Sequence, residues 1–440
     1  MDNLRNVSYV FIPLSFGAYE SFRAVVDELN RDPGWTLVHD EITYMLKYVA
    51  DKINSRDQKN CQCFHYQLNG DVRRDVCDVS QGAWYTLKGR IYKGEPEEFP
   101  FQILSIQLYC FSTTVCILAI KVTFQQNDPY WVSSALYYLK KVSREKIYPQ
   151  NGECEPFTLL ELAKRAMSTM GHFDDLTFFY YANPSTERAN ILTYLETDSM
   201  ENVRHQLYYL RRCYSEGFLY WENSALDKEE LYVHSQDIIW GISPEAAACL
   251  TCGSFGREKF IRGTFYKNFN AQYLFMYVLL LHQKYVLYLF LTRIGIGTYN
   301  NLEMLEEYRS HLYEFETDFV FSCVTEVPQY QNLYDRMTRA FSLETMYKDV
   351  HEPLTALSDV RRISNEEKQQ NRDKNMNRAL VVLSLLSLFS ALVDSFDFIQ
   401  SFFGWFLNDT GVKVAQVICI CAIVITTLYI FKTIWDSRKN

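Results

Sequence analysis

The sequence predicts a mixed α/β (α+β) cytosolic N-terminal domain, followed by a long α-helical stalk and two transmembrane helices per chain. Strand-like and helix-like patterns alternate up to about residue 265, helical spacing dominates after it, and the C-terminal part contains two long apolar runs. These observations divide the 440-residue chain into an α/β domain at residues 1–265, a helical region and stalk at residues 266–378, and a transmembrane hairpin at residues 379–440.

The composition favours a folded protein with a localised membrane segment. The chain is 48% hydrophobic and 16% aromatic, which is typical of a packed core and unlike a disordered chain. Its net charge of -9 disfavours general nucleic-acid binding, which needs a basic surface. The 12 cysteines are dispersed, and Met1 to Arg5 lead directly into a predicted strand without a signal-peptide pattern. We therefore expect a cytosolic domain with reduced thiols and no direct nucleic-acid partner.

Local patterns predict a sheet with several strands in the N-terminal domain. Runs rich in β-branched and aromatic residues predict strands at residues 7–13, 63–68 and 84–92. Apolar residues at helical spacing predict a helix at residues 39–53.

Two further segments in this domain read as hairpins. Residues 101–124 predict two strands joined through residues 111–114, and residues 177–197 predict a hairpin that turns at residues 183–185. The N-terminal domain should therefore be a single multi-stranded sheet with helices.

An apolar run at residues 273–291 is nominally long enough to span a membrane. His282, Gln283 and Lys284 lie at its centre, where an unpaired charge would be costly in lipid. We predict a buried core helix at residues 268–293; the alternative is a true span or a helix on the membrane surface.

Beyond it, a helix is expected at residues 300–325, a stop at Pro328, and then a long helical pattern from residue 329 to the membrane, whose stalk part runs from residue 333 to residue 378. Pro353 is expected to kink that helix without ending it. Such a helix would be about 65–70 Å long. A stalk of this length and pattern is most easily explained by packing against copies of itself, which predicts a homo-oligomer.

Residues 379–407 and 414–431 are each long and apolar enough to cross the hydrocarbon core. Basic residues precede the first run and follow the second, whereas the short connection holds one lysine. The positive-inside bias then places both the N- and C-termini in the cytoplasm. We predict a multi-pass protein of the lipid bilayer, with a helical hairpin pointing outward.

The first predicted span carries a row of polar residues, here called the polar stripe. Its members are Ser387, Ser390, Asp394, Asp397 and Ser401. At 100° per residue they fall within an arc of about 80°. Carboxylates inside hydrocarbon are costly unless they face water or partners, so the stripe predicts a pore lining that favours cations. In the alternative, the serines bond their own backbone and the aspartates lie at the outer interface.

The order of an α/β domain, a long stalk, a first span, a short outer loop and a second span with a basic tail resembles the CorA family of divalent cation transporters. Local likenesses add to this order, at residues 108–118 (LYCFSTTVCIL), 237–243 (DIIWGIS) and 281–285 (LHQKY). The family's Gly-Met-Asn motif is absent. Its place is taken by residues 402–408 (FFGWFLN), so that Gly404, Trp405 and Asn408 form the outer loop.

The resemblance implies a CorA-like pentamer in the inner (plasma) membrane. A CorA-like chain with an enlarged soluble domain and no Gly-Met-Asn motif resembles the membrane effectors associated with type III CRISPR systems. That likeness implies an ion channel opened by a small nucleotide second messenger of the S-adenosylmethionine–AMP type, as part of antiviral defence. The alternative is a magnesium-type transporter of divalent cations gated by its own ion. A membrane-anchored scaffold is a third reading, but it gives Asp394 and Asp397 no role.

Two smaller sets of residues are candidate binding sites. Arg211 and Arg212 lie among tyrosines, a combination that could hold a phosphate and stack a base; the alternative is a solvated pair at a helix end. A second set could supply tetrahedral zinc ligands, but its strand-like alternation favours buried core cysteines and a strand histidine: Cys61, Cys63, His65, Cys249 and Cys252. We assign no metal.

No catalytic spacing stands out, so we predict a protein that is not an enzyme and has no certain cofactor.

Overall fold

A computed structural model describes the chain outside residues 1–3, 17–20, 41, 55–60, 78–81, 91–94, 151–154, 169–176, 179–187, 216–228, 254–255, 294–301, 404–408 and 437–440. The chain divides into two compact units, the sheet unit Met1–Thr355 and the helical unit Ala356–Asn440. This division differs from the boundaries expected at residues 265 and 378, which follow changes of sequence pattern.

The sheet unit is built on a 12-stranded sheet with the order β10-β11-β12-β9-β1-β6-β5-β3-β2, while β4, β7 and β8 pair outside this path. The strands are β1 (Asn6–Ser15), β2 (Trp35–Val38), β3 (Cys63–Leu68), β4 (Tyr85–Arg90), β5 (Pro96–Phe111), β6 (Val115–Phe124), β7 (Ile147–Pro149), β8 (Thr177–Phe178), β9 (Asn190–Thr197), β10 (Leu231–Ser235), β11 (Ile238–Ile242) and β12 (Ala246–Cys252). Only β9 and β12 pair in parallel along the path. The mixed α/β fold is confirmed.

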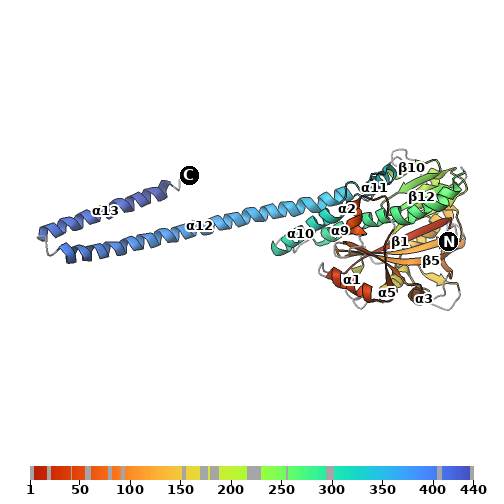
Figure 1. Cartoon of the computed structure of the whole chain (residues 1–440), viewed down its shortest axis with the longest axis horizontal. Coiled ribbons are helices and arrows are strands. Elements are labelled where there is room, and N and C mark those ends of the chain that lie inside the picture. The colour runs from red at the N-terminus through yellow and green to blue at the C-terminus, as the bar shows by residue number, and fades with distance from the viewer. Residues whose placement is uncertain are drawn as a thin grey trace. The chain divides into compact units, whose positions relative to one another are not determined.

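Helices cover both faces of this sheet (Figure 1). They are α1 (Ser21–Arg31), α2 (Lys47–Ile53), α3 (Gly70–Cys77), α4 (Pro129–Leu139), α5 (Leu159–Met167), α6 (Val203–Leu210), the π-helical turns Phe260–Phe265 and Phe269–Tyr273 around α8 (Tyr266–Asn268), α9 (Leu274–Arg293), α10 (Leu302–Phe319) and α11 (Pro328–Ala340). Alternation along β1 assigns the faces. Val10 and Ile12 join the main core with α1, α4, α5 and α6, whereas the ring of Phe11 lies 5.2 Å from that of Tyr277 on α9.

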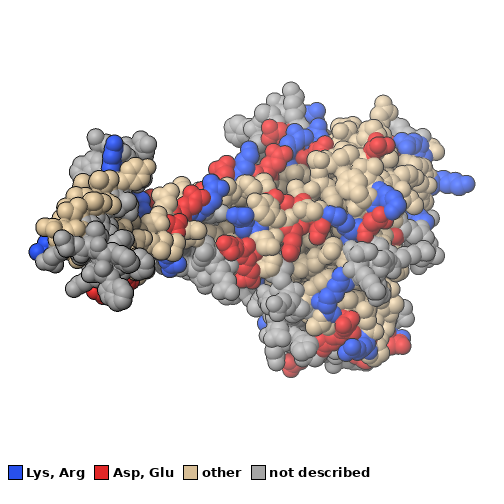
Figure 2. Space-filling model, turned by 60° about the vertical axis from the view of Figure 1, so that its left-hand side comes forward, with Lys and Arg blue, Asp and Glu red and all other residues tan. Residues whose placement is uncertain are grey.

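Several predicted elements are present as expected. β3 has the predicted bounds, and β5 and β6 form the predicted hairpin, with Thr114 in its turn at a φ of 72°. After residue 265 the described residues contain helices and no strand. The face shown in Figure 2 has acidic and basic residues interspersed among the described residues, with no large area of one sign.

Two predictions in the N-terminal domain were wrong. The helix expected at residues 39–53 begins only at Lys47, because the preceding segment bonds elsewhere: Leu46 donates its N–H to the carbonyl of Val324. The hairpin expected at residues 177–197 does not form. β8 and β9 instead each pair antiparallel with β1, at different points along the same edge, and the expected turn lies outside the described residues.

The long helix also differs from its prediction. α11 begins with Pro328, and a break follows it, where Ser342 adopts a left-handed φ of 56°. The stalk helix α12 therefore begins at Leu343 rather than at residue 333, and runs to Phe403 over 61 residues. Pro353 lies inside α12 without ending it, as predicted. In the helical unit α13 (Asp409–Asp436) follows after residues 404–408.

Within the described part of the chain, two helical stretches are long and apolar enough to cross a membrane. They are Phe260–Arg293 and Leu343–Ser395, and α13 contains a shorter apolar stretch, Gln416–Tyr429. The first is 78% buried within its apolar window, so the predicted core helix is confirmed. The second has none of its window buried, which leaves its apolar side chains for lipid or for other copies of the chain.

Candidate functional site

The polar stripe lies entirely on α12. Ser387, Ser390, Asp394, Asp397 and Ser401 are exposed in the single chain. Since α12 is helical throughout, the five side chains project within about 80° of one another. The structure therefore brings all five predicted residues to one side of one helix.

The serines of this helix fall into two groups. Ser384 and Ser395 donate their hydroxyls to the carbonyls of Leu380 and Ala391, one turn earlier. Among the described residues the stripe serines make no such bond. The alternative in which serines bond their own backbone thus applies to the serines outside the stripe, and the stripe hydroxyls remain available to water or ions.

The surroundings of the stripe are apolar and equally exposed. Large exposed hydrophobic side chains occur along the same helix, at Leu380, Val382, Leu383, Leu386, Val393 and Phe398. A soluble monomer rarely exposes so many together. The predicted outer-loop residues Gly404, Trp405 and Asn408 lie outside the described residues.

Arg211 and Arg212 share one acidic partner. Arg211 is buried at the end of α6 and pairs with Glu230, and Arg212 Nη2 donates to both oxygens of the same carboxylate at 2.8 Å. The guanidinium of Arg212 also lies 4.7 Å from the centre of the Tyr208 ring. Arg211 is therefore not the solvated residue of the alternative reading. Phosphate binding at this pair stays a prediction and would compete with Glu230.

A second charged group adjoins this pair, and sequence patterns gave no sign of it. Buried Lys140 donates to the carbonyl of Arg212 at 2.8 Å and pairs with Glu245 at 2.5 Å. Arg188 pairs with the other oxygen of Glu245 at 3.0 Å. Burial alone would raise the pKa of Glu245, but Lys140 and Arg188 lower it below its ordinary value. Both cations therefore pair with the same carboxylate, and the group links α4 to the segments at Arg188 and Glu245.

The four cysteines and one histidine considered as zinc ligands do not come together. Cys63 and His65 lie on β3, whereas Cys249 and Cys252 lie on β12, five strand spacings away or about 24 Å. Cys61 lies just before β3. No group of three or more metal-ligating side chains occurs among the described residues.

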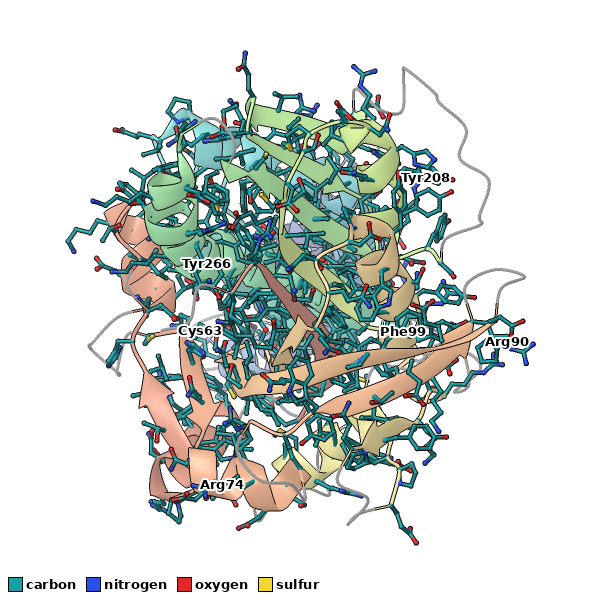
Figure 3. All side chains as sticks on the ribbon, turned by 90° about the vertical axis from the view of Figure 1, so that its right-hand side faces the viewer. Cys63, Arg74, Arg90, Phe99, Tyr208 and Tyr266 are labelled. Carbon is teal, nitrogen blue, oxygen red and sulfur yellow. The ribbon has the colours of Figure 1, made fainter. Side chains whose placement is uncertain are left out.

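His65 has a partner of its own, since its Nδ1 lies 2.8 Å from Asp40. Burial raises the pKa of the Cys63 and Cys249 thiols, which disfavours the thiolate that binds metal. Figure 3 shows Cys63 and Tyr208, which neighbours Arg211, on different sides of the sheet unit. The two candidate binding sets are therefore separate, and the cysteines are core residues.

The sheet unit also contains a cavity of about 540 Å³, here called the helix-base cavity. Its walls come from α9, α10, the segment after α10, α11 and the first turns of α12, at Gln283, Leu287, Phe315, Val320, Phe321, Ser322, Tyr334, Asp335, Thr338, Arg339, Leu343, Glu344, Tyr347 and Lys348. Sequence reasoning missed this site. Its residues come from five separate segments, and none of them carries a motif.

No protein-family model, curated protein or solved structure matches this chain. Function therefore has to be argued from the residues and their geometry.

Proposed function

We propose that the chain is one subunit of a homo-oligomeric, ligand-gated cation channel, and that the polar stripe lines its pore. The observation that carries this proposal is the alignment of three hydroxyls and two carboxylates on one side of an exposed apolar helix. Facing copies around an axis would give these groups water and leave the apolar side chains to lipid and neighbours. A pentamer is the number that the CorA resemblance implies.

A hairpin arrangement supports the membrane part of the proposal. Only residues 404–408 connect α12 to α13. Five residues extend to about 18 Å at most, too little to cross a bilayer of about 30 Å, so both helices would turn back on the same side. The basic residues Arg372, Lys374 and Arg378 precede the apolar part of α12, and Lys432 lies near the end of α13. The positive-inside bias then favours a cytoplasmic location for both termini. The inner (plasma) membrane is the location that the CorA resemblance implies.

Control by a small molecule follows from the size of the soluble part. By its CorA-like order without Gly-Met-Asn, the channel resembles effectors of type III CRISPR defence, and its ligand would be a nucleotide second messenger of the S-adenosylmethionine–AMP type. A shift from 1% to 99% open requires about 5.5 kcal/mol of differential binding, or about 1 kcal/mol for each of five sites. Activation should therefore be sigmoidal. The second candidate, a divalent cation transporter gated by its own ion, is favoured by the two carboxylates of the stripe.

The test is the ratio of divalent to monovalent conductance in planar bilayers. Asp394→Asn/Asp397→Asn keeps side-chain volume and polarity but removes the negative charge. Attraction of an ion scales with its own charge, so the ratio should fall several-fold, and more at low ionic strength. Leu385→Ala, on the opposite side of α12, is the matched control and should leave the ratio unchanged. An unchanged ratio in the aspartate variant, with conductance intact, would remove the stripe from the ion path.

A further inference from the structure

The helix-base cavity has the size of a small-molecule site. Its volume of about 540 Å³ falls in the range of ligand pockets, roughly 300–1,000 Å³. Its interior combines apolar residues such as Leu287 and Leu343 with the aromatic side chains of Phe315, Phe321 and Tyr334. Aromatic walls of this kind favour a flat ring, which stacks or packs edge-on against them.

One polar group points into this apolar interior. Gln283 is 5% exposed, and its Nε2 donates to the carbonyl of Phe319 at 2.6 Å and to the hydroxyl of Tyr334 at 3.2 Å. Within the described part of the chain, its Oε1 accepts no hydrogen bond. A buried amide with its donor side satisfied and its acceptor side open is suited to receive an N–H from a ligand ring.

The rim of the cavity carries two cationic side chains beside two carboxylates. Arg339 and Lys348 are exposed, and neither forms an ion pair among the described residues. Asp335 and Glu344 precede them by four residues, a spacing that often gives helical ion pairs, but here no such pair forms. Two available cations at the mouth of a ring-sized cavity suit an anionic group such as phosphate.

The same cavity spans the break between α11 and α12. Thr338 and Arg339 line it from α11, and Tyr347 and Lys348 line it from the first turns of α12, beyond the left-handed Ser342. Tyr347 also donates its hydroxyl to Glu316 on α10 at 2.7 Å. A molecule seated here would contact both helices at once, and α12 continues as one helix to Phe403.

We propose that the helix-base cavity binds a mononucleotide-sized molecule with an aromatic ring and an anionic group, and that its occupation changes the packing of the first turns of α12. The ring lies among the aromatic side chains with Gln283 as its hydrogen-bond acceptor, and the anion pairs with Arg339 and Lys348. The link from this site to pore opening rests on the proposed channel function.

Binding is tested on the full chain in lipid nanodiscs, with AMP, GMP, CMP and UMP as probes and the matching nucleosides as uncharged comparisons. At least one nucleotide should bind with a dissociation constant below about 1 mM and more tightly than its nucleoside. Arg339→Gln/Lys348→Gln, which changes only exposed residues, should weaken the binding of that nucleotide by about tenfold. Thr338→Trp should fill the cavity and abolish binding, and Thr345→Trp, on an exposed position of α12 outside the cavity, should not.

Conductance measured on the same proteins separates the two proposals. If nucleotide binding follows the pattern above but the parent conducts no ions with or without nucleotide, the site stands and the channel proposal fails. If the parent conducts and nucleotide leaves its open probability unchanged, the link to α12 is overturned. The site itself is overturned if none of the four nucleotides binds, if binding survives Thr338→Trp, or if the Arg339→Gln/Lys348→Gln variant binds like the parent.

Discussion

Two stretches of this chain have nearly the same hydropathy and opposite surroundings. The apolar window of Phe260–Arg293 has a mean hydropathy of 1.6 and is 78% buried, whereas the apolar window of Leu343–Ser395 has a mean hydropathy of 1.8 and is 0% buried. Both pass the test of length and composition for a membrane span. Apolar composition therefore indicates that a helix is shielded from water. It does not indicate whether protein or lipid shields it.

The polar residues distinguish the two stretches. In α9 the three central polar residues each meet a partner from the sheet unit. His282 Nε2 lies 2.7 Å from the hydroxyl of Thr113, Gln283 donates to the carbonyl of Phe319, and Lys284 donates to the carbonyl of Pro244 at 3.1 Å. In α12 the polar stripe has no such partner among the described residues. Polar residues that each bond to another segment of the chain indicate a core helix, and aligned polar residues without such bonds indicate a surface that another molecule completes.

The largest expected effect is on the location of the protein. Deleting residues 356–440 should transfer the chain from the membrane fraction to the soluble fraction, because α9 is already covered by the sheet unit. Alkaline extraction of membranes followed by sedimentation measures this, with the full chain as control. A truncated chain that stays in the alkali-resistant membrane fraction would mean that α9 itself inserts into the membrane. The contrast between a protein-covered α9 and a lipid-covered α12 would then be wrong.

Matched leucines in the two helices should differ in their contribution to stability. Leu280 on α9 is fully buried, whereas Leu386 on α12 is exposed in the single chain. Leu280→Ala should lower the free energy of unfolding by about 2–5 kcal/mol, because it leaves a cavity. Leu386→Ala should cost less than about 1 kcal/mol, since this side chain is exposed and its truncation leaves no cavity within the chain. Thermal unfolding of both variants, followed by tryptophan fluorescence, checks this; equal losses would count against the assigned burial.

The buried charge of α9 should give stability a defined pH dependence. Burial lowers the pKa of Lys284 from 10.5 to about 8. Between these two values the unfolded chain binds the proton that the folded chain has released, so the free energy of unfolding should rise with pH by up to about 3 kcal/mol. Lys284→Met should remove this rise. Burial also lowers the pKa of Lys121 to about 8. The measurement is therefore the difference in unfolding free energy between parent and variant, followed from about pH 7.5 to about pH 10.5. A difference that stays constant over this range would contradict the prediction.

The smallest effect concerns a single hydrogen bond between α9 and the sheet. Thr113→Val keeps the shape of the side chain but removes the only partner of His282 Nε2 among the described residues. Burial lowers the pKa of His282 well below its ordinary value, so the neutral ring cannot compensate by taking a charge. We expect a loss of about 1–3 kcal/mol in unfolding free energy. Thr113→Ser retains the hydroxyl and should retain most of the stability; a similar loss in both variants would point to packing instead.

Sequence patterns predicted those parts of the fold that depend on neighbours in the chain. β3 and the β5–β6 hairpin are continuous runs of strand-forming residues with a short turn, and both are present. The break at Ser342 was missed because helix-forming sequence lies on both sides of it, while the backbone turns through a left-handed residue. The expected hairpin at residues 177–197 failed because β1 offers one edge to both β8 and β9.

The candidate sites also differ in whether they depend on neighbours in the chain or on distant segments. The polar stripe could be read from the sequence because a helix converts spacing along the chain directly into a shared face. The pairing of both Arg211 and Arg212 with Glu230, and the separation of the cysteine sets by four intervening strands, depend on contacts between distant segments. The helix-base cavity has no local signature for the same reason.

By itself, the sequence determined the strand and helix types of the longest patterns, the apolar character of α9, α12 and part of α13, and the polar stripe. These follow from interactions between residues a few positions apart, which act in the same way in any fold. Only the tertiary structure decided that α9 is a core helix, that Thr113 and Pro244 bond to His282 and Lys284, and that α9 to α12 line a cavity. The physical reason is that burial and hydrogen-bond satisfaction depend on which distant segments meet, and the order of residues along one helix does not specify that.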